Sequence, residues 1–478
     1  MAEGTGIAAN VAALCVTQFA DVCSVYLHGS GPLPAAIAAR ETSRFAALRS
    51  VARDDTYVDR TRGAGIEILV EEPLVAGGRA VGALVVGFRA GRKLTPAIRA
   101  ALRRYASILA TAAEQAERLD LHFHVSKRLQ QALLPARLAE VEGIRFDAAY
   151  LPATAGTDVG GDWYDTFEIG NGLIGISIGD VVGHGIEAAV AMSEIRGAIR
   201  ATAAATQSPA EVLRMADELM VAQTKGLATA IVGFYDPATG VLRYASAGHP
   251  APVLLLQSGR AGTLPAGGVI LGLGSGNSSG DITITIPPGA TLFLYTDGLL
   301  EYDRDPIAGE VRLLATIERL HGSDHYADAL HAALFGNGVQ NADDCATLAI
   351  HRLRNGRASE RYTYSAIAQC AALAREALRE FSGTFAQGRE HGFDVLTAVG
   401  EAIANAIEHG ANGDRALFEI DAGIRDGEIV VEVRSRGHWR AFAPSIDRGR
   451  GLHIMRTCAK RLEISSEQDE TRVKLIFG

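Results

Sequence analysis

Apolar residues in the first part of the chain form strand-like runs followed by one long helical repeat. Strands are predicted from the apolar runs at residues 20–27, 66–74 and 80–87. A repeat with one apolar face follows at 95–119, and the helical period continues to Pro135, which would end a helix. The pattern therefore predicts a small α+β domain at residues 1–115 and a linker helix at residues 116–138.

The middle part, residues 140–354, has the pattern of a β-rich domain with two early helices. Strand patterns occur at residues 145–151, 173–180, 228–235, 241–245, 282–286, 291–295 and 347–353. Helical repeats occupy 186–202 and 209–223, and the second has Ser208 before it and Pro209 at its first position, which is a typical helix start. Two sheets flanked by helices would bury these apolar runs.

The last part, residues 362–478, follows a polar break at 355–363. Helical repeats and then strand patterns occur at 365–381, 394–409, 417–424, 428–434, 461–465 and 472–477. At 478 residues the chain fits about three domains of roughly 100 to 200 residues each. We predict a multidomain α/β fold of the α+β kind, with the linker helix between the first two domains.

Composition and charge exclude several classes of protein. The chain is 48% hydrophobic, yet no apolar run reaches the ~18 residues that a membrane helix needs, and its start lacks the pattern of a signal peptide. A formal net charge of −9 argues against direct binding to nucleic acid. Five cysteines without a CxxC pair argue against a disulfide framework and a zinc site. We expect a soluble, cytoplasmic protein.

Four acidic motifs lie in the middle part: GGDWYD at 160–165, IGDVVGHG at 178–185, LYTDG at 294–298 and ADDCATL at 342–348. A single aspartate in a glycine-flanked turn usually accepts backbone hydrogen bonds. Several carboxylates at strand ends would instead repel one another unless cations or protons lie between them. Oxygen-only ligands favour Mg²⁺ or Mn²⁺, so the four motifs together predict a divalent-metal site.

In order and spacing these motifs, with LQQALLP at 129–135 and ASAGHPAP at 245–252, resemble the SpoIIE-like branch of the PPM-type protein phosphatases. The resemblance covers residues 140–354. It implies an αββα sandwich that binds two Mn²⁺ or Mg²⁺ ions. It also implies hydrolysis of phosphoserine or phosphothreonine by a water molecule that the two ions activate, without a covalent phosphoenzyme.

The resemblance assigns the metal ligands by position. The implied ligands are Asp162, Asp180, the backbone carbonyl of Val181, Asp297 and Asp343. Asp344 is the alternative to Asp343, because the family always has an acid at the first of these positions and only sometimes at the second. Asp165 could orient a water from outside this set. His184 or His249 could protonate the leaving alkoxide, although a role in packing the glycine-rich loops is favoured for both.

A second set of motifs lies in the last part. AVGEAIANAIEHG at 398–410 places Glu401 and Asn405 one helical turn apart on one face. With VRSRGHWR at 433–440 and DRGRGLHIM at 447–455, it resembles the anti-sigma-factor serine kinases of the GHKL ATPase superfamily. The resemblance implies a GHKL-type α/β sandwich that binds ATP, with Asn405 on Mg²⁺ and Glu401 as base or water-positioner. The implied nucleotide-binding residues are Glu401, Asn405, Ser435, Gly437, Gly449 and Gly451.

One position departs from that family. Where the kinases usually have an aspartate that hydrogen-bonds the adenine amino group, this chain has Ser435, whose hydroxyl accepts without charge assistance. The difference is typically ~1 kcal/mol or more, which corresponds to about tenfold weaker ATP binding. An active kinase and a domain that only binds its partner protein therefore both remain open.

The first domain resembles a GAF sensory domain, through EEPLVAGGRAVGALVVGF at 71–88 and the order of its elements. The linker helix would transmit the signal of such a sensor. Coaxial helices of this kind also make a homodimer through the linker a reasonable expectation.

Together the resemblances predict a bacterial signalling phosphatase. Its expected substrate is a phosphorylated anti-sigma-factor antagonist of the STAS type, whose dephosphorylation frees a sigma factor. The last domain would phosphorylate or bind the same antagonist. The rival hypothesis is a catalytically degenerate scaffold that sequesters a sigma factor or an antagonist without turnover. Acids at all four motifs argue against the scaffold for the middle domain, whereas Ser435 favours it for the last one.

Overall fold

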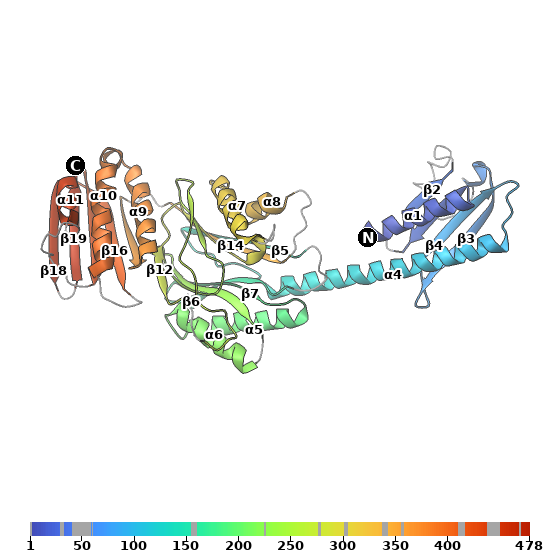
Figure 1. Cartoon of the computed structure of the whole chain (residues 1–478), viewed down its shortest axis with the longest axis horizontal. Coiled ribbons are helices and arrows are strands. Elements are labelled where there is room, and N and C mark those ends of the chain that lie inside the picture. Colours follow the sequence, from blue (N-terminus) through green and yellow to red (C-terminus); the bar gives the residue numbers. More distant parts are fainter. Residues whose placement is uncertain are drawn as a thin grey trace. The chain divides into compact units, whose positions relative to one another are not determined.

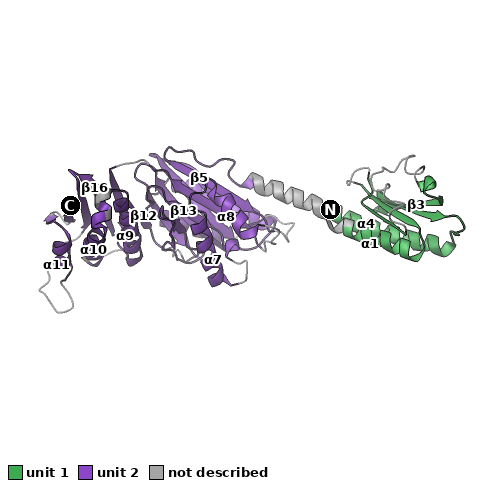
Figure 2. Ribbon diagram, turned by 90° about the horizontal axis from the view of Figure 1, so that it is seen from above, with its two compact units in different colours: residues 1–126 green, residues 127–478 purple. Residues whose placement is uncertain are grey.

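The computed structural model describes residues 2–28, 33–40, 59, 61–153, 160–223, 226–275, 279–300, 305–336, 343–354, 358–409, 416–436, 450–467 and 470–478. The chain divides into two compact units, residues 1–126 and residues 127–478 (Figure 2). Throughout the described ranges, no helix combines the length and the apolar character required to cross a lipid bilayer.

The first unit is an antiparallel sheet packed against helices. Its elements are α1 (Ala2–Gln18), β1 (Val22–Leu27), β2 (Ala36–Ala39), β3 (Ile66–Ala76), β4 (Arg79–Arg89) and α4 (Pro96–Leu133). The strand order is β2-β1-β4-β3, and Gly77 and Gly78, both with positive φ, make the turn between β3 and β4. Leu102 and Leu109 on the apolar face of α4 are buried in the core of this unit. The three predicted strands are present, whereas the short β2 was not predicted.

The second unit begins with a sandwich of two five-stranded sheets. Its strands are β5 (Ile144–Leu151), β6 (Trp163–Gly170), β7 (Leu173–Val181), β8 (Ala228–Asp236), β9 (Val241–Ala247), β10 (Val253–Leu255), β11 (Ala261–Thr263), β12 (Ile282–Thr285), β13 (Thr291–Tyr295) and β14 (Cys345–Arg352). One sheet has the order β12-β9-β8-β7-β6 and the other β11-β10-β13-β14-β5. Helices α5 (Ile186–Ala203) and α6 (Pro209–Gln223) cover the first sheet, and α7 (Pro306–Arg319) and α8 (Tyr326–Phe335) cover the second (Figure 1). This is the predicted αββα arrangement.

The linker helix is part of α4, which is one uninterrupted helix of 38 residues. It ends at Leu133, two residues before Pro135, as the helical period predicts. Leu133 packs against the buried cluster under α5 that contains Trp163. The N–H of Ala139 donates a hydrogen bond to Thr166 Oγ1 of β6 at 2.8 Å. Within the second unit, the end of the linker helix is therefore attached to β6 and to the core beneath α5.

The last domain is one sheet covered by helices. Its elements are β15 (Ser359–Ser365), α9 (Ala368–Gly383), α10 (Ala386–His409), β16 (Leu417–Arg425), β17 (Glu428–Arg436), α11 (Arg450–Cys458), β18 (Arg461–Glu467) and β19 (Glu470–Phe477). The strand order is β15-β16-β17-β19-β18. The predicted strands are present, and α10 begins earlier than predicted.

Strand β15 corrects the prediction of a polar break at 355–363. The described part of that stretch pairs with β16 as an edge strand, and the helix predicted from residue 365 begins only at Ala368. Its polar residues alternate with buried tyrosines: Tyr362 and Tyr364 point into the core, whereas Arg361 is exposed. Such alternation is the pattern of a strand with one buried face.

The edge strands β12 and β15 join the sandwich to the last domain. The N–H of Thr283 donates to Ser365 Oγ at 2.8 Å. The N–H of Thr363 donates to Thr285 Oγ1 at 2.7 Å, and that hydroxyl donates back to the Thr363 carbonyl oxygen at 3.2 Å. These bonds run through side-chain hydroxyls, so the two sheets meet edge to edge without forming a continuous ladder.

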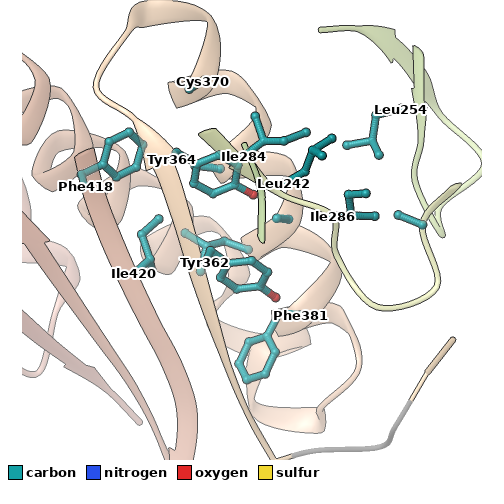
Figure 3. Close-up of a cluster of buried hydrophobic side chains, with 14 of the residues drawn as sticks. Leu242, Leu254, Ile284, Ile286, Tyr362, Tyr364, Cys370, Phe381, Phe418 and Ile420 are labelled. Carbon is teal, nitrogen blue, oxygen red and sulfur yellow. The ribbon is translucent and has the colours of Figure 1, made fainter. Parts of the chain in front are cut away.

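A shared apolar core lies beside these bonds (Figure 3). It includes Leu242, Ile284 and Ile286 from the sandwich and Tyr362, Tyr364 and Phe381 from the last domain. A buried ion pair, Arg352 with Glu360 at 3.6 Å, also connects the two domains. Because one hydrophobic cluster extends through both domains, we expect them to unfold together.

Candidate active site

Five aspartates from the acidic motifs occupy strand ends of the sandwich. In one sheet, Asp162 immediately precedes β6, and Asp180 lies near the end of its antiparallel neighbour β7. In the facing sheet, Asp297 lies two residues after the end of β13. Asp343 and Asp344 precede β14, the antiparallel neighbour of β13. The start of one strand meets the end of its antiparallel partner, so each sheet gathers its acids at one end.

A hydrogen-bonded bridge shows that these ends of the two sheets coincide. Thr296, the residue before Asp297, donates through Oγ1 to Asp162 Oδ2 at 2.7 Å. The N–H of Ala346 donates to the same Thr296 Oγ1 at 2.9 Å. All three bonded residues are buried. The carboxylate of Asp162 is therefore fixed in position by the facing sheet.

Glycines permit the close approach of the chain segments that carry the acids. A Cβ atom at Gly161 would overlap the carbonyl oxygen of Val181, and one at Gly160 would overlap the carboxylate of Asp344. At Gly298 it would overlap the backbone of Asp344. The glycines in GGD and TDG are thus required by space, because any side chain would push the acidic segments apart.

The carboxylates raise one another's pKa. Burial raises the pKa of Asp162 well above its usual range, the neighbouring Asp180 carboxylate raises it further, and the Thr296 hydrogen bond opposes this. Burial likewise raises the pKa of Asp180 to about 6, a hydrogen bond with Asp162 opposes this, and repulsion from Asp297, Asp343 and Asp344 adds to the rise. The predicted acids from all four motifs therefore act on one another electrostatically.

These residues match a Mg²⁺ or Mn²⁺ site in the chemistry of their donors. Every candidate ligand is a carboxylate or a backbone carbonyl oxygen, which is the donor type that these ions prefer. Cations between the carboxylates would also remove the repulsion that raises their pKa values. Across the described ranges, no three His, Cys, Asp or Glu side chains are already grouped so as to hold one ion. The assignment of individual ligands therefore stays a prediction.

Asp343 and Asp344 differ in their surroundings. Asp343 is exposed, and its Oδ1 accepts the N–H of Asp344 at 2.8 Å. Asp344 is buried, and its Oδ1 accepts the N–H of Ala153 at 2.9 Å. Both carboxylates act on Asp180. Asp344 thus braces the loop that follows β5, whereas Asp343 faces solvent at the rim of the cluster.

Other polar residues that sequence reasoning placed near the chemistry have different partners. His249 is buried with Nδ1 2.8 Å from Thr229 Oγ1, and burial lowers its pKa to about 3, which favours the neutral imidazole near pH 7. This supports the packing role. His184 is exposed in the loop after β7. Asp165 is buried and accepts two hydrogen bonds from Arg200 of α5, at 2.6 and 2.8 Å, so it faces the helix rather than the acidic cluster.

The described residues of the second predicted site lie in the last domain, on α10, at the end of β17 and at the start of α11. Gly451 at the start of α11 lies against α10: a Cβ there would be 2.7 Å from Glu401 Oε2 and 3.8 Å from Asn405 Nδ2. Asn405 and Ser435 line one pocket together with Thr471. Gly437 and Gly449 lie outside the described residues.

Thr471 was missed by the sequence analysis. It lies on β19 directly opposite Ser435 on β17, and it lines the same pocket as Asn405 and Ser435. The strand pattern was placed at 472–477, one residue too late to include it. Only the register between β17 and β19 identifies this position.

Replacing Ser435 with aspartate is expected to tighten ATP binding by about tenfold, because a charged acceptor strengthens the hydrogen bond to an adenine amino group. Titration of the chain with Mg²⁺-ATP measures the effect. Ser435→Asn is the matched control, since it adds an acceptor of similar size without charge. Equal affinities for the parent, Asn and Asp chains would show that position 435 does not contact the base.

Comparison with protein families identifies both domains of the second unit. Residues 170–353 match the family Stage II sporulation protein E (SpoIIE). Residues 363–477 match the family of histidine kinase-like ATPase domains. Residues 170–353 therefore form a SpoIIE-type phosphatase domain of the PPM class, and a histidine kinase-like ATPase domain follows it.

Individual relatives match parts of this chain. Protein IcfG of Synechocystis sp. is 25% identical over 268 residues, covering 48% of this chain and 42% of IcfG. Phosphoserine phosphatase RsbU of Bacillus subtilis is 27% identical over 189 residues, covering 39% of this chain and 55% of RsbU. Anti-sigma F factor of Clostridium botulinum is 30% identical over 118 residues, covering 22% of this chain and 82% of that factor. The chain thus spans about half the length of IcfG and RsbU.

Among solved structures, the RsbU and RsbW domains of Rv1364c from Mycobacterium tuberculosis are similar to this chain. The two share 27% sequence identity. The match covers 72% of this chain and 95% of that structure, with a TM-score of 0.43.

Proposed function

We propose that the chain is a Mn²⁺- or Mg²⁺-dependent phosphatase that removes phosphate from serine or threonine of a signalling protein. The observation that carries the proposal is the cluster of aspartates from all four motifs, which meets at one end of the sandwich, where burial and then repulsion from neighbouring carboxylates raise the pKa of Asp180 to about 6. The match of residues 170–353 to the SpoIIE family supports the same chemistry. Buried carboxylates that repel one another require compensation by cations or protons.

The chain's own residues would hold the ions, and small residues between them would let the ligands approach one another. Asp162, Asp180 and the Val181 carbonyl would provide ligands from one sheet, and Asp297 with Asp343 or Asp344 would provide them from the other. Thr296 keeps the Asp162 carboxylate turned into the cluster. The glycines leave room for close approach of these segments. When bound, the ions supply a water activated for attack on phosphorus and neutralise charge on the phosphoryl oxygens.

The proposed substrate is a serine-phosphorylated anti-sigma-factor antagonist of the STAS type. Two relatives support this choice: one is named a phosphoserine phosphatase and matches part of the chain, and another is named an anti-sigma F factor and is similar in size to the ATPase-like domain. A single chain with both kinds of domain suits a phosphorylation switch in sigma-factor signalling. A sigma factor is a second proposed partner.

The ATPase-like domain has two proposed roles, an opposing serine kinase or a module that binds the antagonist. The juxtaposition of Gly451 with Glu401, and of Asn405 with Ser435, supports a nucleotide site with bound Mg²⁺. Ser435 in place of an acid favours the binding module. A scaffold without any turnover is the alternative for the whole chain, and the complete set of aspartates argues against it.

Metal removal tests the enzyme against the scaffold. After EDTA treatment and removal of the chelate, hydrolysis of p-nitrophenyl phosphate is expected to be absent and to return on addition of Mn²⁺ or Mg²⁺. Hydrolysis that persists in EDTA would contradict the metal-dependent mechanism. A chain that binds the antagonist but releases no phosphate with either ion would support the scaffold.

We further propose that the first unit is a GAF-like sensor acting through α4, which also offers a surface for a homodimer. Arg128→Pro is expected to break this helix at a cost of ~3 kcal/mol or more and to remove sensor control. The measurement compares the phosphatase activity of the variant with that of a chain that starts at residue 127. The two activities should be equal. Arg128→Ala is the control that keeps the helix. The parent and the truncated chain should differ in activity. If the proline variant then had the activity of the parent, the proposed coupling would be contradicted.

A further inference from the structure

Five large apolar side chains near the acidic end of the sandwich are exposed to solvent. Their exposed fractions lie between 46% and 78%, for Val182, Ile186, Val190, Ile307 and Val311. Single exposed apolar residues are ordinary on protein surfaces. These five instead occur in two groups, and each group follows a strand end beside which a proposed metal ligand lies.

The first group follows β7. Val182 is the residue after Val181, whose carbonyl oxygen is a proposed ligand, and α5 begins four residues later at Ile186. Ile186 and Val190 are one helical turn apart and share the face of α5 that points away from the core. The opposite face of the helix is buried through Ala188, Ala189 and Met192, among others.

The second group follows β13. Asp297 opens the short helix η2 (Asp297–Leu299), and the start of α7 packs directly on the next residue, Leu300: a Cβ at Gly309 would overlap the Leu300 carbonyl oxygen. Ile307 and Val311 are again one helical turn apart on an exposed face. Leu313 and Ile317 bury the other face.

The two groups flank one site because the strand ends that they follow meet there. Thr296, the residue before Asp297, donates a hydrogen bond to Asp162 at 2.7 Å. Trp163, the residue after Asp162, pairs with Gly179, the residue before Asp180, so the ends of β7 and β13 are close in space. The first turns of α5 and α7 therefore begin on either side of the aspartate cluster. An apolar rim in this place cannot be covered by a small phosphate ester, whereas a protein that presents its phosphoserine to the cluster would cover it.

We propose that these five side chains are the docking surface for the folded, serine-phosphorylated protein substrate, which contacts α5 with one side and α7 with the other. This inference rests on the proposed phosphatase function. The chain has a formal net charge of −9, so its overall charge does not attract an anionic phosphoprotein. Apolar contact would supply the affinity instead. Full burial of one such side chain corresponds to about tenfold or more in affinity.

The test compares the parent with the Ile186→Gln/Ile307→Gln double variant, in Mn²⁺, on two substrates. Glutamine removes the apolar contact without adding a charge near the aspartates. For a serine-phosphorylated STAS-domain protein, we expect kcat/KM to fall by at least about tenfold through a higher KM. For p-nitrophenyl phosphate, kcat/KM should stay within about twofold, which also shows that the variant is folded and holds its metal.

Leu353→Gln is the matched control. Leu353 is 43% exposed in the same domain, but it follows the end of β14, whereas the acids precede the start of that strand. This control should leave both substrates unaffected. Unchanged KM for the phosphoprotein in the double variant, or an equal loss on both substrates, overturns the docking surface and leaves the phosphatase proposal standing. A parent chain that hydrolyses neither substrate overturns the phosphatase proposal and the docking surface with it.

Discussion

Asp162→Asn is expected to lower Mn²⁺-dependent phosphate release by about three orders of magnitude, because metal ions contribute several kcal/mol to stabilisation of the transition state. Asp162 is buried in the cluster, and its carboxylate accepts a hydrogen bond from Thr296 of the facing sheet. The asparagine keeps an oxygen that can accept the Thr296 hydrogen bond. The loss should therefore come from the missing charge on the ligand and not from a displaced side chain.

Thermal unfolding separates this effect from misfolding. In EDTA, Asp162→Asn should be at least as stable as the parent, because it removes one of several buried carboxylates that repel one another. In Mn²⁺ the parent should gain more stability than the variant, since the ions bind the folded chain. Asp236→Asn is the matched control: Asp236 lies at the other end of β8 and accepts hydrogen bonds within a turn. Activity retained in Asp162→Asn would remove Asp162 from the metal site.

Tyr364→Ala is expected to destabilise the phosphatase domain, although Tyr364 belongs to the ATPase-like domain. The side chain is 1% exposed, stacks on Phe418 with ring centroids 5.7 Å apart, and lies in the core shared with Ile284 of the sandwich. Removing a buried aromatic ring typically costs about 3–5 kcal/mol. Because the core is continuous, the loss should affect both domains of the second unit.

The measurement is the temperature at which phosphatase activity is lost, beside a calorimetric scan of the same chain. Tyr364→Ala should lower the inactivation temperature by several degrees and keep a single unfolding transition for the second unit. Tyr364→Phe, which retains the ring, should remain close to the parent. If the ATPase-like domain of the alanine variant melted alone while phosphatase inactivation stayed at the parent temperature, the two domains would not share one cooperative core.

The acidic cluster could be predicted from sequence because its signals are local. Each aspartate stands beside glycine or at the end of an apolar run, and both features are visible within a few residues. The antiparallel pairing of β6 with β7 and of β13 with β14 then brings the acids together. The individual roles of Asp343 and Asp344 were not predictable, because they depend on contact with Ala153, which is distant in sequence.

Elements stabilised by distant partners were missed. Strand β6 contains the buried Asp165, whose partner Arg200 lies 35 residues further along the chain. A charged residue at a buried position interrupts the apolar alternation by which a strand is predicted. Strand β15 has the composition of a polar break, and its role as a strand becomes visible only from its contacts with β12 and β16. Helix α7 exposes Ile307 and Val311, which blurs its apolar period. The position of Thr471 depends on strand register, which no local pattern gives.

The most direct test of the central claim is phosphate release from a serine-phosphorylated STAS-type antagonist by the full chain in Mn²⁺. The parent is expected to release one phosphate per molecule of phosphorylated antagonist and to turn over repeatedly. The Asp162→Ala/Asp297→Ala double variant, which removes one ligand from each sheet, is expected to release none above background. Absence of release by the parent, or undiminished release by the double variant, would contradict a metal-dependent phosphatase built on these aspartates.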